Sequence, residues 1–77
     1  MKPSLDDLAL FVTIADEGGF TAAATALGLP KSTVSRRLAD LELLLRTSLF
    51  RRSTRALSLT DEGRRIYEMA KPSITAA

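Results

Sequence analysis

The sequence predicts a mostly helical fold: three helices, a short two-stranded hairpin and a further helix. Apolar residues recur at three- and four-residue spacing over most of the chain, which is typical of amphipathic helices. Residues 49–59 change to an alternating pattern, which indicates strands. With 77 residues, of which 45% are apolar, the chain is long enough for one small domain with a buried core.

The first helix is expected over residues 5–17. Ser4 can cap its N-terminus, and Asp7 stands at the third helical position, as in a capping box. Gly18 and Gly19 end it, because glycine accepts a left-handed cap conformation at low cost. Its expected apolar face consists of Leu5, Leu8, Phe11, Val12 and Ala15.

The second helix is expected over residues 21–27, and it is almost entirely alanine and threonine. Its small side chains would let a neighbouring helix approach closely. Phe20, just before it, is expected to pack into the core, and Gly28 stops the helix after two turns.

The third helix is expected over residues 31–45, directly after Pro30, which is well tolerated at a helix start. Two sets of residues divide its surface. The buried stripe is formed by Val34, Leu38, Leu41 and Leu45. The opposite side carries Ser32, Ser35, Arg36 and Ala39.

Two strands are expected at residues 49–52 and 57–59, joined by the loop 53–56. Thr60 can cap a last helix, in which Pro72 is expected to cause a bend or a weak point. The apolar stripe of this helix contains Ile66, Met69, Ala70, Ile74 and Ala77.

Composition excludes several classes of function. The chain has no cysteine and no histidine, which rules out disulfides, thiol catalysis and the commonest general base and metal ligand. It also has no glycine-rich phosphate loop, so neither an enzyme nor a cofactor or metal site is predicted. No apolar run approaches the roughly 18 residues that span a bilayer, and the N-terminus does not resemble a signal peptide. A soluble, cytoplasmic domain is expected, with no membrane contact.

Charge is distributed unevenly along the chain. Residues 1–20 carry one cation and four acids, whereas residues 31–65 carry nine cations and four acids. Between Leu43 and Thr60 there are four arginines and no acid. This basic zone suggests a polyanionic partner, although an ordinary solubilising surface would have the same composition.

Two helices joined by a tight glycine-containing turn, with a polar and basic outer face on the second, indicate a helix-turn-helix. The candidate base-reading residues are Lys31, Ser32, Thr33, Ser35 and Arg36. A basic hairpin after such a helix would form a wing, whose candidate minor-groove or phosphate contacts are Arg51, Arg52 and Arg55. The two helices alone are equally compatible with a generic amphipathic helix pair, and the basic hairpin shifts the balance towards a helix-turn-helix. Arg64 and Arg65 are interpreted as a solvated helix face.

Several short motifs together match a known family. They are Leu8-Ala-Leu-Phe11, Gly19-Phe-Thr-Ala-Ala-Ala24, Leu27-Gly-Leu29, Thr33-Val-Ser-Arg36, Leu41-Glu42, Leu49-Phe-Arg-Arg52 and Leu57-Ser-Leu-Thr-Asp-Glu-Gly63. On these residues the chain resembles the N-terminal DNA-binding domain of LysR-type transcriptional regulators, which has a winged helix-turn-helix fold.

The resemblance implies roles for particular positions. It places Lys31, Ser32, Ser35 and Arg36 in the major groove of DNA, Arg55 at the minor groove on the tip of the wing, and Thr21 near a phosphate. Members of the family often have serine, glutamine and proline where Pro30, Lys31 and Ser32 stand, and glycine where Arg46 stands. At Arg46 either a left-handed backbone or a longer helix is expected.

The resemblance also implies an organisation. Residues 1–60 would form the DNA-binding domain. Residues 61–77 would begin a linker and dimerisation helix, with Met69, Ala70 and Ile74 facing a second copy. The expected function is sequence-specific binding, as a homodimer, to an interrupted palindrome in promoter DNA. Small-molecule regulation would belong to an effector-binding domain that these residues do not include. The alternative is a winged-helix protein-interaction module that does not bind DNA.

Overall fold

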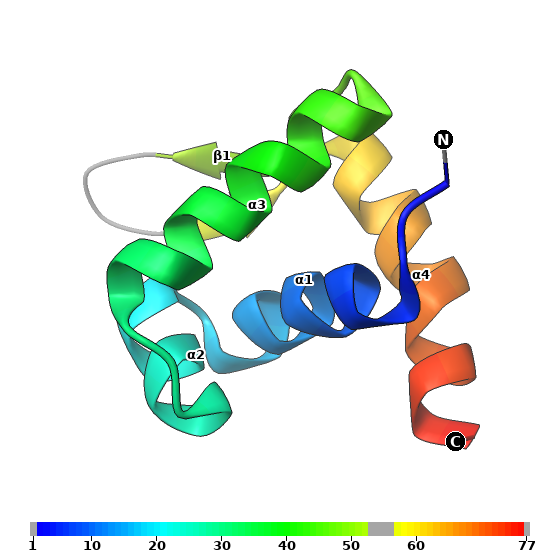
Figure 1. Ribbon diagram of the computed structural model, residues 1–77. Coiled ribbons are helices and arrows are strands. Elements are labelled where there is room, and N and C mark those ends of the chain that lie inside the picture. Colours follow the sequence, from blue (N-terminus) through cyan, green and yellow to red (C-terminus); the bar gives the residue numbers. More distant parts are fainter. Residues whose placement is uncertain (1, 53–56, 77) are drawn as a thin grey trace.

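The computed structural model describes residues 2–52 and 57–76. Within these ranges the elements follow the order α1 (Leu5–Glu17), α2 (Phe20–Leu27), α3 (Lys31–Leu45), β1 (Phe50–Arg52), β2 (Leu57–Leu59) and α4 (Asp61–Ala76). Figure 1 shows α3 crossing above α1, with α2 at one end of the domain and α4 at the other. The predicted mostly helical fold with a two-stranded hairpin is confirmed.

Local signals place the helix ends as the sequence predicts. Ser4 Oγ accepts a hydrogen bond from the Asp7 N–H at 3.1 Å, and Asp7 Oδ2 accepts one from the Ser4 N–H at 3.2 Å, which completes the capping box. Gly18 ends α1 in the left-handed conformation, at φ 81°. Helix α2 begins at Phe20, one residue earlier than predicted.

The core lies where α1 meets α2, α3 and α4. The largest fully buried side chains are Phe11, Ile14, Val34, Leu38, Leu41 and Leu49. The predicted apolar face of α1 was wrong in part, because Leu5 is 54% exposed while Leu10 and Ile14 are buried. Helix α1 is covered by neighbours on several sides, so its buried surface is wider than a single stripe.

The hairpin is attached to the core through aromatic contacts. Its strands pair antiparallel, with Phe50 opposite Leu59. The ring of Phe50 makes edge contacts with Phe11 and Phe20, at centroid distances of 5.4 and 6.4 Å. Leu49, which was expected in the first strand, precedes it and is fully buried. These contacts hold the base of the hairpin against α1 and α2.

The start of α4 is tied closely to the segment before β1. The Thr60 N–H donates to the carbonyl of Leu49 at 3.1 Å, and its Oγ1–H donates to the carbonyl of Ser48 at 2.6 Å. Thr60 Oγ1 also accepts from the Gly63 N–H at 2.9 Å, so it caps α4 as predicted. A Cβ atom on Gly63 would lie 2.1 Å from the Leu49 carbonyl oxygen, so only glycine allows this approach.

Helix α4 runs through Pro72, which does not end it. Ile66 packs against the core of its own domain. The expectation that Ala70 faces a second copy is wrong, because Ala70 is only 5% exposed and belongs to the domain's own core. Ile74 also packs against that core. Among the described residues of the stripe, Met69 stays open, at 74% exposure, and Ala77 lies outside the described residues. The apolar stripe of α4 therefore serves largely to cover its own domain.

Candidate nucleic-acid interface

The turn between α2 and α3 has helix-turn-helix geometry. Gly28 takes the left-handed conformation at φ 67°, and the Leu29 N–H donates to the Ala24 carbonyl at 3.0 Å. Pro30 then precedes α3 in an extended conformation. Ala23 and Ala24 are buried, so the small side chains of α2 allow close helix packing, as predicted.

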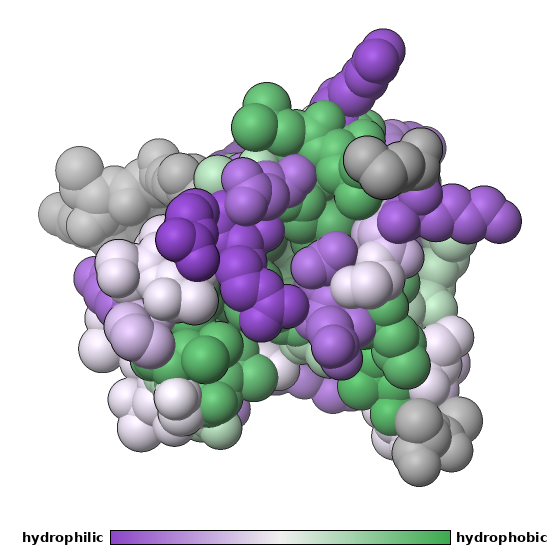
Figure 2. Space-filling view, in the orientation of Figure 1, coloured by the Kyte–Doolittle hydropathy of each residue, from purple (hydrophilic) through white to green (hydrophobic). Residues whose placement is uncertain are grey.

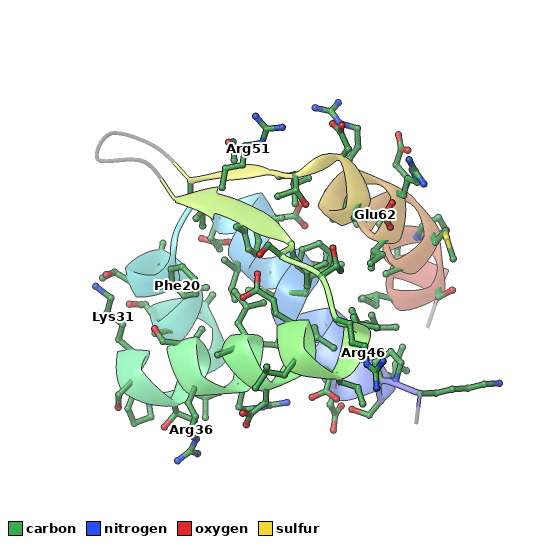
Figure 3. The ribbon with its side chains drawn as sticks, turned by 90° about the horizontal axis from the view of Figure 1, so that it is seen from above. Phe20, Lys31, Arg36, Arg46, Arg51 and Glu62 are labelled. Carbon is green, nitrogen blue, oxygen red and sulfur yellow. The ribbon has the colours of Figure 1, made fainter. Side chains whose placement is uncertain are left out.

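The outward face of α3 gathers the predicted base-reading residues on one side of the molecule. Lys31, Ser32 and Arg36 are exposed, and Thr33 and Ser35 are partly exposed. Figure 3 shows Arg36 pointing away from the body of the domain and Lys31 at its outer edge, beside α2. The opposite side of the helix is anchored by the buried side chains of Val34, Leu38 and Leu41.

The two neighbouring arginines of α3 point to different surroundings. Arg37 lies 3.6 Å from a carboxylate oxygen of Asp7 on α1, measured from its Nη2 atom. Arg36 lies on the exposed face. Arg36 can therefore contact a ligand, whereas its neighbour Arg37 is paired within the domain.

The N-terminus of α3 favours an anion. Its first turn contains no acidic residue, and Pro30 supplies no side-chain hydrogen bond to cap it. Lys31 adds a positive charge at the end of the helix where the dipole is already positive. At the start of α2, Thr21 is also exposed.

Figure 2 shows hydrophilic side chains gathered over the middle of α3 and a hydrophobic patch over its C-terminal end. Leu43, which is 76% exposed, lies in that C-terminal part. The buried stripe predicted from the sequence does not include Leu43, and no pattern in the sequence indicates that this leucine is exposed.

The wing arginines are not all brought to the face that α3 presents. Arg51 is exposed on β1 opposite Ser58, and Figure 3 shows it pointing to the other side of the domain from Arg36. Arg52 lies on β1, but its side chain is outside the described residues, as is the whole of Arg55.

The helix α4 arginines lie on an exposed face. Arg64 and Arg65 are both exposed, and Arg65 pairs with Glu62 one turn earlier at 2.9 Å. This arrangement agrees with the solvated face that the sequence indicated.

Arg46 ends α3 in the left-handed conformation, at φ 57° and ψ 38°. Its N–H donates to the Leu43 carbonyl at 3.2 Å, and the Thr47 N–H donates to the Glu42 carbonyl at 3.1 Å. These bonds form the left-handed type of helix C-cap, a position that glycine usually occupies. The left-handed alternative for Arg46 is thus confirmed.

A cluster that the sequence did not reveal joins α1 to α4. Asp16 accepts hydrogen bonds from the Tyr67 hydroxyl and the Lys71 ammonium group, both at 2.5 Å. The bonds from Lys71 and then Tyr67 lower the pKa of Asp16, and the same carboxylate raises the pKa values of Tyr67 and Lys71. The partners are 51 and 55 residues apart in the chain, so no local pattern predicts them.

Other kinds of site are not seen in the part of the chain that the structure describes. Residues 2–52 and 57–76 contain no group of three or more acidic, histidine or cysteine side chains placed to hold a metal ion. Among the same residues no helix is long and apolar enough to cross a membrane.

Comparison with known proteins connects this arrangement to a family. Residues 5–64 match the family model described as bacterial regulatory helix-turn-helix protein, lysR family. An HTH-type transcriptional repressor of Pseudomonas aeruginosa is 52% identical over 64 residues, which cover 83% of this chain and 20% of the repressor. The Escherichia coli regulator DmlR is 45% identical over 69 residues, which cover 90% of this chain and 22% of DmlR. The chain thus spans about a fifth of the length of these relatives.

Solved structures of similar fold give the same result as the sequence comparison. Oxidised OxyR of Corynebacterium glutamicum superposes with a TM-score of 0.90 at 37% identity, over 99% of this chain and 25% of OxyR. A BenM DBD in complex with catB site 1 DNA superposes with a TM-score of 0.90 at 31% identity, over 96% of this chain and 83% of the BenM chain.

Proposed function

The chain belongs to the lysR family of bacterial regulatory helix-turn-helix proteins, and we propose that it binds double-stranded DNA sequence-specifically as the DNA-reading part of a transcriptional regulator. The observation that carries this proposal is the face of α3 formed by Lys31, Ser32 and Arg36, which is exposed and backed by a buried anchor. A major groove is wide enough for one α-helix and presents base edges to such side chains. The superposition on a BenM DBD solved with DNA supports the same function for this fold. A cytoplasmic location, where bacterial DNA lies, belongs to the proposal.

In this proposal α3 is the recognition helix. Arg36 donates two parallel hydrogen bonds to a guanine, and the hydroxyls of Ser32, Thr33 and Ser35 and the ammonium group of Lys31 contact bases or phosphates. The positive end of α3 and the exposed Thr21 at the start of α2 suit backbone phosphates.

The hairpin of β1 and β2 is the wing in this proposal. Arg52 and Arg55 are its proposed minor-groove or phosphate contacts. Arg51 is left out, because it points to the opposite side of the domain from Arg36 (Figure 3).

A matched pair of substitutions on the recognition helix tests base reading. Arg36→Ala should cost about 1–3 kcal/mol of binding free energy at a preferred site, selected from a random duplex pool, and should relax preference at one base position. Arg37→Ala removes a cation from the neighbouring position, but this cation faces Asp7, so base preference should stay unchanged. Equal losses on selected and random DNA for Arg36→Ala would make it a phosphate contact instead.

A homodimer formed through α4 is the second part of the proposal. Exposed Met69 borders an apolar groove of about 250 Å³. The groove is lined by Pro3, Leu8, Leu45, Ile66, Met69, Ala70 and Ser73. In the proposed homodimer, a second copy covers this groove and the outer side of α4 as far as Ile74. Two recognition helices would then meet one duplex, as an interrupted palindrome requires.

The protein-interaction alternative would use the exposed Leu43 at the C-terminal end of α3.

DNA binding through Lys and Arg should weaken steeply as salt rises, because counterions are released. It should hardly change between about pH 6 and 8, since no histidine or cysteine titrates there. A chain that shows no salt-dependent binding to duplex DNA would favour the alternative, and Leu43→Ser should then abolish partner capture.

A further inference from the structure

The turn between α3 and β1 contains a carboxylate that the proposed base contacts do not use. Glu42 lies in the last turn of α3, and its Oε2 accepts a hydrogen bond from the backbone N–H of Leu49 at 2.7 Å. A hydrogen bond to an ionised acceptor is roughly twice as strong as a neutral one. This bond joins the recognition helix directly to the residue that precedes the wing.

The position of Glu42 is unfavourable for a helix taken alone. A negative charge in the last turn opposes the helix dipole, which favours cations there. Any stabilising effect of this carboxylate must therefore come from its contacts, and the bond to the Leu49 N–H is one of them. Its acceptor atom reaches past the left-handed residue Arg46 to a backbone group that is seven residues away.

Between the described residues of β1 and β2 and those of α3, there is no extensive packing. Among the described residues, extensive packing joins β1 to β2 and β2 to α4, but not either strand to α3. The ring of Phe50 attaches β1 to α1 and α2 through Phe11 and Phe20. The short turn 46–48 and the bond across it therefore provide the direct connection from α3 to the wing, in addition to the indirect one through Phe50 and the core.

Leu49 is also hydrogen-bonded to Thr60, the residue that caps α4. The Leu49 carbonyl accepts the Thr60 N–H at 3.1 Å, so the two ends of the hairpin are held at the same residue. A movement of Leu49 away from Glu42 would carry both strands with it.

We propose that Glu42 is a positioning residue for DNA recognition. Its bond to the Leu49 N–H holds the wing at the spacing that lets wing arginines enter the minor groove while α3 occupies the major groove. The proposal rests on the proposed DNA-binding function and assigns Glu42 no contact with DNA.

The test measures flank selectivity, which is the ratio of affinities for duplexes with A·T-rich and G·C-rich flanks around one selected site. The narrow minor groove of A·T-rich DNA attracts arginine, so this ratio reports wing contact. Arg55→Ala gives the ratio for a wing without its tip arginine. Partial unfolding of a variant divides both affinities by the same factor, so a purely structural role leaves the ratio unchanged.

Glu42→Ala should reduce flank selectivity to the level of Arg55→Ala, and the double variant should show no further loss. Glu42→Gln should stay nearer to the parent protein, because an amide oxygen can still accept the Leu49 N–H. Asp40→Ala, which removes an exposed acid from the same helix, should change both affinities alike. Hydrogen exchange of the Leu49 amide should be faster in Glu42→Ala and close to the parent rate in Glu42→Gln.

Unchanged selectivity in Glu42→Ala, with both affinities lowered equally, would overturn the positioning role and leave a stabilising role. A parent protein that binds DNA without flank selectivity would also overturn it, while DNA binding would stand. A parent protein that binds no duplex DNA would refute the proposed function itself, and the positioning role with it.

Discussion

Replacing Gly63 by alanine should destabilise the domain strongly, although alanine is the better helix former. The added Cβ would lie 2.1 Å from the Leu49 carbonyl oxygen, whereas carbon and oxygen normally approach to roughly 3.3 Å. Helix α4 or the segment at Leu49 would have to move by about 1 Å. Both are held by hydrogen bonds from Thr60, so the movement must weaken those bonds as well.

The magnitude follows from three contributions. Overpacking at a rigid site costs about 1–3 kcal/mol, and weakening the Thr60 hydrogen bonds costs about 1 kcal/mol each. The higher helix propensity of alanine returns about 1 kcal/mol. The free energy of unfolding should therefore fall by about 2–4 kcal/mol. In a domain of this size that corresponds to a melting temperature lowered by roughly 10–30 °C.

Thermal unfolding followed by circular dichroism measures this effect. Glu68→Ala is the matched control, because it places alanine at an exposed position of the same helix and should change stability by less than about 0.5 kcal/mol. If Gly63→Ala melted at or above the parent temperature, the close approach of α4 to Leu49 could not be a rigid constraint, and the reasoning would be refuted.

Three further predictions concern the other special positions. Arg46→Gly should raise the melting temperature by a few degrees, since glycine adopts the left-handed conformation without the cost of about 1 kcal/mol that arginine bears there; a lower melting temperature would show that the arginine side chain is needed. Asp16→Asn should remove part of the acid sensitivity of stability. In the parent protein the pKa of Asp16 is lowered from 3.8 by Lys71 and Tyr67, so the unfolded chain binds the proton more readily than the folded one. Stability is therefore lost as pH falls from about 4 through the folded pKa. If the free energy of unfolding had the same pH dependence in both proteins between about pH 2 and 6, this prediction would be contradicted. Met69→Glu should weaken binding to a full palindrome but not to a half-site, because Met69 is exposed, whereas Ile74→Asp should also lower the melting temperature, because Ile74 packs against the core; gel-shift assays on both DNA lengths, with melting curves, separate these outcomes.

Local features of the fold could be predicted from the sequence because the atoms involved are close in the chain. The capping box of Ser4 and Asp7 needs partners three residues apart, and the turns at Gly18 and Gly28 need only the glycine itself. The same holds for the anchored recognition helix, whose buried and exposed residues alternate with a regular period.

Features that depend on contacts between distant segments could not be predicted in this way. Gly63 stood in a recognised motif, but the reason for glycine there is the carbonyl of Leu49, 14 positions earlier. Ala70 was assigned to a second copy because a periodic stripe does not show which part of it the domain itself covers. For Arg51, strand alternation indicates exposure but not the side of the molecule on which the residue lies (Figure 3).

The division of α3 into a buried anchor and an exposed face has an evolutionary consequence. Substitutions at Ser32 or Arg36 remove no core contact, and exposed positions of this kind usually change stability by less than about 0.5 kcal/mol. With the base-reading role proposed for these positions, a duplicated copy of the gene could therefore acquire a new operator through a few such changes while its product stays folded at every step. The same scaffold can in this way give rise to many regulators with different targets.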